Sequence, residues 1–213
     1  MKLILVTKKS QFCKIVQEYV SRKIPEAIIY EGDTGDVLPI IEATGAIIIS
    51  FLSPWIIPGL ILNQAKLSIN FHPAPPKYPG TGCYNFAIYN REQEFGVTCH
   101  HMLAAVDSGP IIKVVKFPLF ETDTVYTLKN RTQDYLLQLF YDIFDSVLQQ
   151  MALPNSDEKW LRKPYTRKDL LQLCQITKEM SETEVTLRIK ATFFPDGKDG
   201  PYIDLYGYRF KLS

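Results

Sequence analysis

Short runs of apolar, mostly β-branched residues without polar alternation constrain the fold of this chain most strongly. Residues 3–6 and 46–49 are such runs, and residues 27–30 and 67–71 resemble them. Strands of this kind are buried on both faces, as in a parallel sheet covered by helices. Along the chain between residues 3–6 and 27–30, a stretch beginning at Ser10 carries apolar residues at helical spacing. The pattern predicts an α/β fold with a Rossmann-like, mostly parallel sheet flanked by helices.

The rest of the chain divides into further elements and a distinct C-terminal part. In the first part we expect helices over 36–43, 59–66, 83–90 and 124–151 and strands over 95–102 and 111–117. In the second part we expect short helices over 166–173 and 181–191, a turn region over 194–201 and a hairpin of 202–205 with 208–212. These elements predict a Rossmann-like domain at 1–153 and a small C-terminal helix and β-hairpin extension at 154–213.

Charge and cysteine usage exclude several classes of protein. The 24 Lys plus Arg residues nearly balance the 23 Asp plus Glu residues, so binding driven by nucleic-acid phosphates is not favoured. The apolar runs are too short to span a bilayer, and the apolar start is closed by Lys8 and Lys9, unlike an export signal. The four cysteines are widely spaced and form no C-x-x-C pair. We therefore expect a cytoplasmic protein with no membrane partner.

Candidate chemistry lies where the fourth expected strand ends. Asn70 and His72 are two residues apart, so their side chains share one face of the sheet. The segment 72–82 then holds four prolines and two glycines, which build a stiff loop. Ligands in open α/β sheets bind at such strand ends. Asp107 stands in a second loop, and we expect His72 and Asp107 to lie in loops outside the core.

At this point the sequence resembles a known family. Residues 70–80 (NFHPAPPKYPG), 96–98 (GVT) and 106–112 (VDSGPII) resemble, in order and spacing, the 10-formyltetrahydrofolate-dependent formyltransferases. The chain departs from the family pattern at Ala74, Pro75 and Pro79, and its N-terminal half is shortened. The connector around Trp160 and the terminal hairpin are most like those of the nucleotide-sugar N-formyltransferases. The resemblance implies transfer of a formyl group from 10-formyltetrahydrofolate to the amine of a nucleotide-linked amino sugar.

The resemblance assigns catalytic roles to Asn70, His72 and Asp107, and the chemistry suits them. Formyl transfer to an amine develops an oxyanion, which the Asn70 amide can stabilise as a hydrogen-bond donor. The attacking nitrogen loses a proton, which His72 can accept as general base. Asp107 can orient the ring and stabilise its protonated form. No metal ion is required.

The resemblance also implies two sets of binding residues. The cofactor-binding set is Phe51, Leu52, Ser53, Ile56, Ala104, Ala105 and Val106. The substrate-binding set is Lys77, Tyr78, Gly80, Thr81, Trp160 and Arg162. Backbone groups of the first set would match the edge of the pterin ring, while apolar side chains cover its faces.

Several alternatives remain open. The acceptor could instead be methionyl-tRNA or glycinamide ribonucleotide, or the chain could be a non-catalytic folate- or nucleotide-binding module of the same fold. Cys99, His100 and His101 are consecutive on an expected strand, so they point to alternate faces and cannot converge on a metal ion. His101 either lines the site or fills the core. The aromatic hairpin needs a surface to bury one face, so we expect a homodimer formed through it.

Overall fold

The apolar runs form the centre of a six-stranded sheet in the computed structural model, which describes residues 1–195 and 200–212. Leu3 and Leu5 belong to a core cluster with residues of α1 (Gln11–Lys23) and α4 (Val125–Leu148). Ile4 and Val6 point to the opposite face, where α2 (Gly59–Leu62) covers them. Both faces of the central strands are therefore buried, which explains why these runs show no polar alternation.

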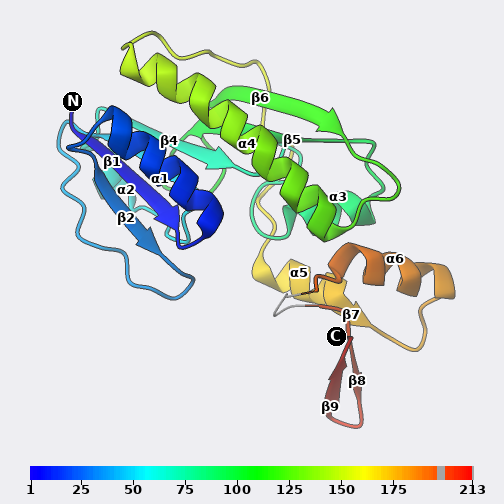
Figure 1. The fold of residues 1–213 in the computed structure, drawn as a ribbon. Coiled ribbons are helices and arrows are strands. Elements are labelled where there is room, and N and C mark those ends of the chain that lie inside the picture. Colours follow the sequence, from blue (N-terminus) through cyan, green and yellow to red (C-terminus); the bar gives the residue numbers. More distant parts are fainter. Residues whose placement is uncertain (196–199, 213) are drawn as a thin grey trace.

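The sheet is mixed, with its parallel part first. Its order is β2 (Ile28–Gly32), β1 (Leu3–Lys8), β3 (Ile47–Phe51), β4 (Leu67–His72), β5 (Glu94–His101) and β6 (Ile111–Pro118). The strands β2, β1, β3 and β4 run parallel, whereas β5 runs antiparallel to both β4 and β6. Figure 1 shows α1 and α4 lying across one face of this sheet. The predicted α/β, Rossmann-like fold is confirmed.

The helix predicted over residues 36–43 is wrong, because this segment is irregular. Pro39 lacks an N–H donor, and the residue before a proline is biased toward extended backbone. Long-range hydrogen bonds hold the segment instead: the Trp55 indole donates to the Asp36 carbonyl at 2.9 Å, and the Tyr30 hydroxyl donates to the Ile40 carbonyl at 3.2 Å. The segment covers the same sheet face as α2 without being helical.

The C-terminal part contains α5 (Arg167–Cys174), β7 (Gln175–Ile176), α6 (Glu182–Thr192), β8 (Tyr202–Leu205) and β9 (Tyr208–Lys211). The helix α6 packs on α3 (Cys83–Tyr89), where the Asn85 amide donates to the Ala191 carbonyl at 2.7 Å. The predicted hairpin is present and projects away from the main sheet (Figure 1). The two-residue β7, which pairs with β8, is too short to read from sequence. Residues 196–199 of the predicted turn region lie outside the described residues.

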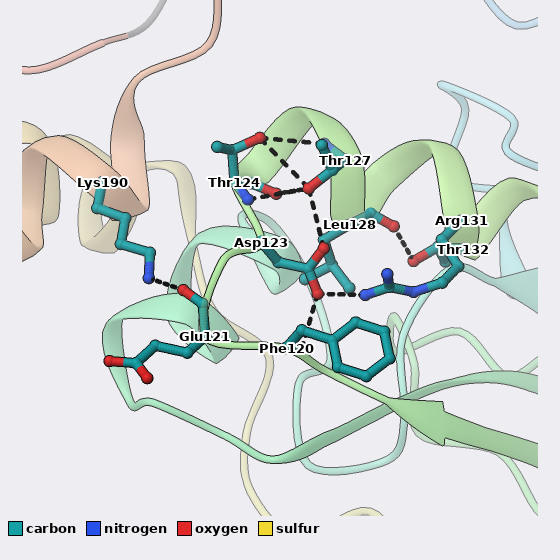
Figure 2. A network of polar contacts seen from close by, with 9 residues as sticks. All are labelled: Phe120, Glu121, Asp123, Thr124, Thr127, Leu128, Arg131, Thr132 and Lys190. Atoms are coloured by element: carbon teal, nitrogen blue, oxygen red, sulfur yellow. Dashed lines mark hydrogen bonds and ion pairs between the residues drawn. The ribbon is translucent and has the colours of Figure 1, made fainter.

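A polar network fixes the start of α4 (Figure 2). Thr124 and Thr127 form a reciprocal capping box. The buried Asp123 carboxylate accepts hydrogen bonds from the Phe120 amide at 2.8 Å and the Thr127 hydroxyl at 3.0 Å, and it pairs with Arg131. The Lys190 ammonium of α6 donates to the Glu121 carbonyl in the adjacent loop, and this bond ties α6 to the start of α4.

The Asp123→Ala substitution is expected to lower the free energy of unfolding by about 2 kcal/mol, because it leaves buried donors unpaired. Denaturant titration of the full chain measures this change. Asp134→Ala is the matched control, since Asp134 is an exposed carboxylate on the same helix. Equal stability of the two variants would contradict the role given to the network.

Candidate active site

The candidate catalytic side chains meet on one face at the end of β4. Asn70 and His72 share that face because they are two residues apart on the strand. The antiparallel strand β5 places His100 opposite Asn70 and Thr98 opposite His72. The pairing of β4 with β5 therefore brings a second histidine next to the predicted pair.

His72 lies between a carbonyl and a carboxylate. Its Nε2–H donates to the Tyr78 carbonyl at 3.0 Å, and its Nδ1 lies 3.3 Å from Asp107 Oδ2. A proton on Nδ1 would therefore make a charge-assisted contact with Asp107. His72 and Asp107 are 5% and 7% exposed, so the expectation that both lie outside the core is wrong. His72 is the last residue of β4, where β5 and the proline-rich loop cover it.

His100 completes the cluster, and the sequence analysis did not select it. Its Nδ1–H donates to the His101 carbonyl at 2.8 Å, while its Nε2 lies 3.1 Å from Asn70 Nδ2 and 3.4 Å from Asp107 Oδ1. In the neutral ring, Nε2 thus accepts one N–H of Asn70 and leaves the other for a substrate oxygen. His101 lies on the opposite face of β5. Strand alternation predicts from the sequence that His100 and His101 lie on opposite faces of β5. It does not predict which of the two lies on the same face as Asn70.

Asp107 connects the loops around the cluster. It adopts a left-handed backbone conformation with φ of 43°, and its Oδ2 accepts the Gly80 N–H at 2.7 Å. Burial by itself would raise the pKa of Asp107, but His72, His100 and the Gly80 N–H together hold that pKa well below its ordinary value. Asp107 is therefore ionised near neutral pH.

A hollow of about 90 Å³ opens beside this cluster and includes part of the predicted cofactor set. Ile56, Ala105 and Val106 line it together with Asn70, His100 and Asp107. Its position fits the pterin crevice that the family resemblance implies, because apolar side chains stand next to the reactive groups.

The other predicted cofactor residues surround the hollow without lining it. Leu52 has a left-handed backbone with φ of 54°, the Ser53 hydroxyl accepts the Trp55 N–H at 3.1 Å, and Ala104 is exposed beside Gly59. Phe51 is fully buried and packs against Phe71 and Phe140. Alternation along β3 turns the Phe51 ring into the core, so the backbone groups of Phe51 are what remain for the predicted cofactor contact.

Four predicted substrate residues belong to the proline-rich loop. The Lys77 ammonium pairs with Glu92 at 2.6 Å. Tyr78 is 1% exposed and its hydroxyl donates to Glu92 at 2.6 Å, so its side chain lies inside the fold. The Gly80 N–H is used by Asp107, and the Thr81 N–H donates to the Tyr165 carbonyl at 2.9 Å. These contacts with other parts of the chain hold the loop in place. Its prolines have no N–H, so the loop has few backbone donors of its own.

The two residues predicted from the connector have different positions. The half-buried Trp160 ring lies against His72 and His100 with centroid distances of 5.9 and 5.0 Å. Arg162 is exposed, and its guanidinium lies 3.2 Å from the centre of the Tyr165 ring. The structure therefore brings Trp160 to the cluster and leaves Arg162 on the surface beside it.

A larger cavity, of about 620 Å³, lies between α6 and the start of α4 and is lined by none of the clustered residues. Among the described residues, no three His, Cys, Asp or Glu side chains are arranged to hold a metal ion. No helix in the described part of the chain is both long and apolar enough to cross a bilayer. Titratable groups and a hollow coincide at the end of β4, which makes that place the candidate active site.

Comparison with known proteins shows which family this chain matches. The family model described as Formyl transferase matches residues 7–143. Methionyl-tRNA formyltransferase of Lactococcus lactis subsp. cremoris (strain SK11) is 28% identical over 139 residues, which make up 63% of this chain and 43% of that protein. The chain therefore spans less than half the length of the curated relatives that it matches over this region.

Solved structures match over the C-terminal part as well. A sugar N-formyltransferase from Shewanella sp FDAARGOS_354 has a TM-score of 0.79 and 18% identity, covering 100% of this chain and 96% of that chain. The N-formyltransferase from Helicobacter canadensis, solved with folinic acid and dTDP-3-aminofucose, has a TM-score of 0.74 and 19% identity, covering 97% and 85%. At these identities the matches show that the fold is shared, including the region after residue 153.

Proposed function

This chain belongs to the formyl transferase family, and from that premise we propose that it transfers a formyl group from 10-formyltetrahydrofolate to the primary amine of a nucleotide-linked amino sugar. The observation that carries this proposal is the convergence of Asn70, His72 and Asp107 beside an apolar hollow. We place the catalytic groups in a domain at 1–153 and a smaller extension at 154–213. The folate would supply the formyl carbon that the amine attacks.

Each of the three side chains has a role that its contacts support. The Asn70 amide keeps one N–H for the oxyanion that develops on the formyl oxygen. His72 takes the proton of the attacking amine on Nδ1, because its Nε2–H already donates to the Tyr78 carbonyl. Asp107 then stabilises the protonated ring across the 3.3 Å contact. The proton is returned to the leaving nitrogen of the folate when the carbon–nitrogen bond breaks.

Three observations support the choice of acceptor. The solved sugar N-formyltransferase from Shewanella matches the whole of this chain, extension included. The Helicobacter canadensis structure holds a nucleotide-linked amino sugar together with a folate derivative. The near balance of acidic and basic residues also favours a small acceptor over a transfer RNA.

A transfer assay tests the proposal directly. Purified full chain is incubated with 10-formyltetrahydrofolate and, in separate reactions, nucleotide-linked amino sugars, glycinamide ribonucleotide and methionyl-tRNA, and products are identified by mass spectrometry. We expect a formylated amino sugar. Formylation of either other acceptor alone would assign the chain to that class. Tight binding of folinic acid without transfer to any acceptor would identify a non-catalytic binding module.

We also propose that the chain forms a homodimer through its hairpin. The register of β8 with β9 puts Ile203, Leu205, Tyr208 and Phe210 on one face, and Tyr202 on the other. Tyr202 packs with Leu170 and Cys174, so the apolar face points outward. Tyr208 and Phe210 are 71% and 56% exposed. A two-fold interface would cover this face on both subunits.

Light scattering of the protein at micromolar concentration is expected to give the mass of a dimer, and Phe210→Lys is expected to give a monomer, because a charge would be buried in the interface. Tyr126→Lys is the matched control, since Tyr126 is an exposed aromatic residue of α4. A monomeric wild-type protein, or a Phe210→Lys variant that stays dimeric, would reject this interface.

A further inference from the structure

The connector that follows α4 crosses directly in front of the candidate active site. Its backbone is tied to the proline-rich loop, because the Leu161 N–H donates to the Pro76 carbonyl at 3.2 Å and the Tyr165 N–H donates to the Pro79 carbonyl at 2.9 Å. At its start, the Ser156 N–H donates to the Ile111 carbonyl at 3.1 Å. Residues 156–165, here termed the strap, therefore connect β6 to the loop that follows His72.

Trp160 links the strap to the loop that carries Asp107. Its indole N–H donates to the Gly109 carbonyl at 2.8 Å. Gly109 itself approaches β5 so closely that a Cβ atom there would lie 1.8 Å from the His101 carbonyl oxygen. The indole thus holds a short, tightly seated loop two residues beyond Asp107.

The indole ring also contacts both histidines of the cluster. It lies edge-on to His100 with an interplanar angle of 89° and to His72 with an angle of 69°. His72 and His100 are 5% and 3% exposed. Edge-to-face packing of this kind fixes ring orientation and excludes water from the face that it covers.

The other end of the strap acts on Asp107 through Gly80. The Tyr165 N–H and carbonyl bond to Pro79 and Thr81, the two neighbours of Gly80, and the Tyr165 ring stacks on Phe86 at 3.7 Å. These contacts orient the Gly80 N–H, which donates to Asp107 Oδ2 at 2.7 Å. A Cβ atom on Gly80 would lie 2.3 Å from the Tyr165 carbonyl oxygen, so this close approach requires glycine.

Building on the proposed function, we propose that Trp160 is a positioning residue through which the strap holds His72, His100 and Asp107 in their reactive arrangement. The sequence analysis placed Trp160 in the substrate-binding set. The structure places its ring against His72 and His100 and its N–H on the Gly109 carbonyl, in the loop that carries Asp107. The C-terminal extension is thereby part of the active site.

Steady-state kinetics of the full chain separate positioning from substrate binding. Trp160→Ala is expected to lower kcat by about a hundredfold, with the KM of each substrate changed less than about threefold, because misplaced groups slow the chemical step. Trp160→Phe keeps a ring against the histidines and is expected to restore most of kcat. Leu161→Ala is the control, since Leu161 is 68% exposed on the same strap.

Each other kinetic result overturns the proposal. A rise in KM at unchanged kcat would return Trp160 to substrate binding. Wild-type kinetics for Trp160→Ala would remove its role. A Trp160→Phe variant no more active than Trp160→Ala would exclude the ring contacts. If Trp160→Ala fails to fold, Trp160→Phe, which lacks the indole N–H, is compared with wild type by amide exchange. Unchanged exchange in that variant would overturn the proposal.

Amide hydrogen exchange tests the strap without any acceptor. In Trp160→Ala the Gly80 amide is expected to exchange about tenfold faster, while the Ile49 amide in β3 keeps its rate, because only the strap and its loops are released. Unchanged exchange at Gly80 in a folded Trp160→Ala variant would overturn the proposal. If wild type formylates no acceptor, the proposed function fails, whereas the exchange rates still decide the role of the strap.

Discussion

The His72→Asn variant is expected to lose about a thousandfold in kcat while it remains folded, because it removes the ring nitrogen that is proposed to take the amine proton. The asparagine amide is shorter than the imidazole and reaches the position of Nδ1, but not that of Nε2, which donates to the Tyr78 carbonyl at 3.0 Å. It cannot accept a proton where Nδ1 faces Asp107 at 3.3 Å. The binding of folinic acid, measured by calorimetry, is expected to change little.

His101→Asn is the matched control for this experiment. His101 is the same residue type on the neighbouring strand, but it lies on the opposite face of the sheet. The control is expected to keep near wild-type kcat. A His72→Asn variant that retains more than about a tenth of the wild-type rate with a verified acceptor would remove His72 from the role of general base.

The Asp107→Asn variant is expected to lose about a thousandfold or more in kcat, because the neutral amide cannot stabilise a protonated His72. The same carboxylate also accepts the Gly80 N–H at 2.7 Å and lies 3.4 Å from His100. Asparagine conserves the shape of the side chain, whereas alanine would leave three buried partners without an acceptor. The amide variant therefore isolates the effect of the charge.

The charge of Asp107 also makes stability depend on pH. The pKa of Asp107 is lowered in the folded chain, where His72, His100 and the Gly80 N–H outweigh the opposing effect of burial. A lowered pKa means that the carboxylate contributes stability above its unfolded pKa of about 3.9, and that this contribution is lost as the pH falls below that value. Asp107→Asn lacks this contribution at every pH.

Denaturant titrations at pH 7, 5 and 3 measure this effect. Wild type is expected to be more stable than Asp107→Asn at pH 7 and 5, and the difference is expected to shrink at pH 3. Asp142→Asn serves as control, because Asp142 forms an exposed pair with Lys113. A difference between wild type and Asp107→Asn that stays constant from pH 7 to 3 would show that the pKa of Asp107 is not lowered in the folded chain.

Much of the fold follows from local sequence patterns. The apolar runs at 3–6 and 46–49 predict strands covered on both faces, and the structure places their alternate residues in two separate cores. The i, i+2 spacing of Asn70 and His72 predicts a shared face. This is confirmed because Asn70 contacts His100, His72 contacts Asp107, and His100 and Asp107 contact each other. These predictions succeed because the period of a strand is set by its own backbone.

Other features depend on which segments meet. His100, which was not predicted, enters the site through the register of β5 with β4. On the other edge of β5, its register with β6 shifts between Cys99 and His100. Phe51 was assigned to the cofactor and Tyr78 to the substrate, yet both side chains are buried. The strand that contains Phe51 and the loop that contains Tyr78 were predicted. The direction in which each side chain points was not.

The sequence by itself determined the α/β class and the strands of the main sheet, because strand periodicity and proline chemistry act over short distances along the chain. It also predicted the site residues Asn70, His72 and Asp107, through the resemblance of their motifs to a known family. Only the tertiary structure decided that His100 joins them and that Trp160 returns across the site, 88 residues after His72. Contacts between segments so far apart depend on how whole elements pack. No local pattern specifies that packing, since the same local pattern is compatible with more than one register or connection.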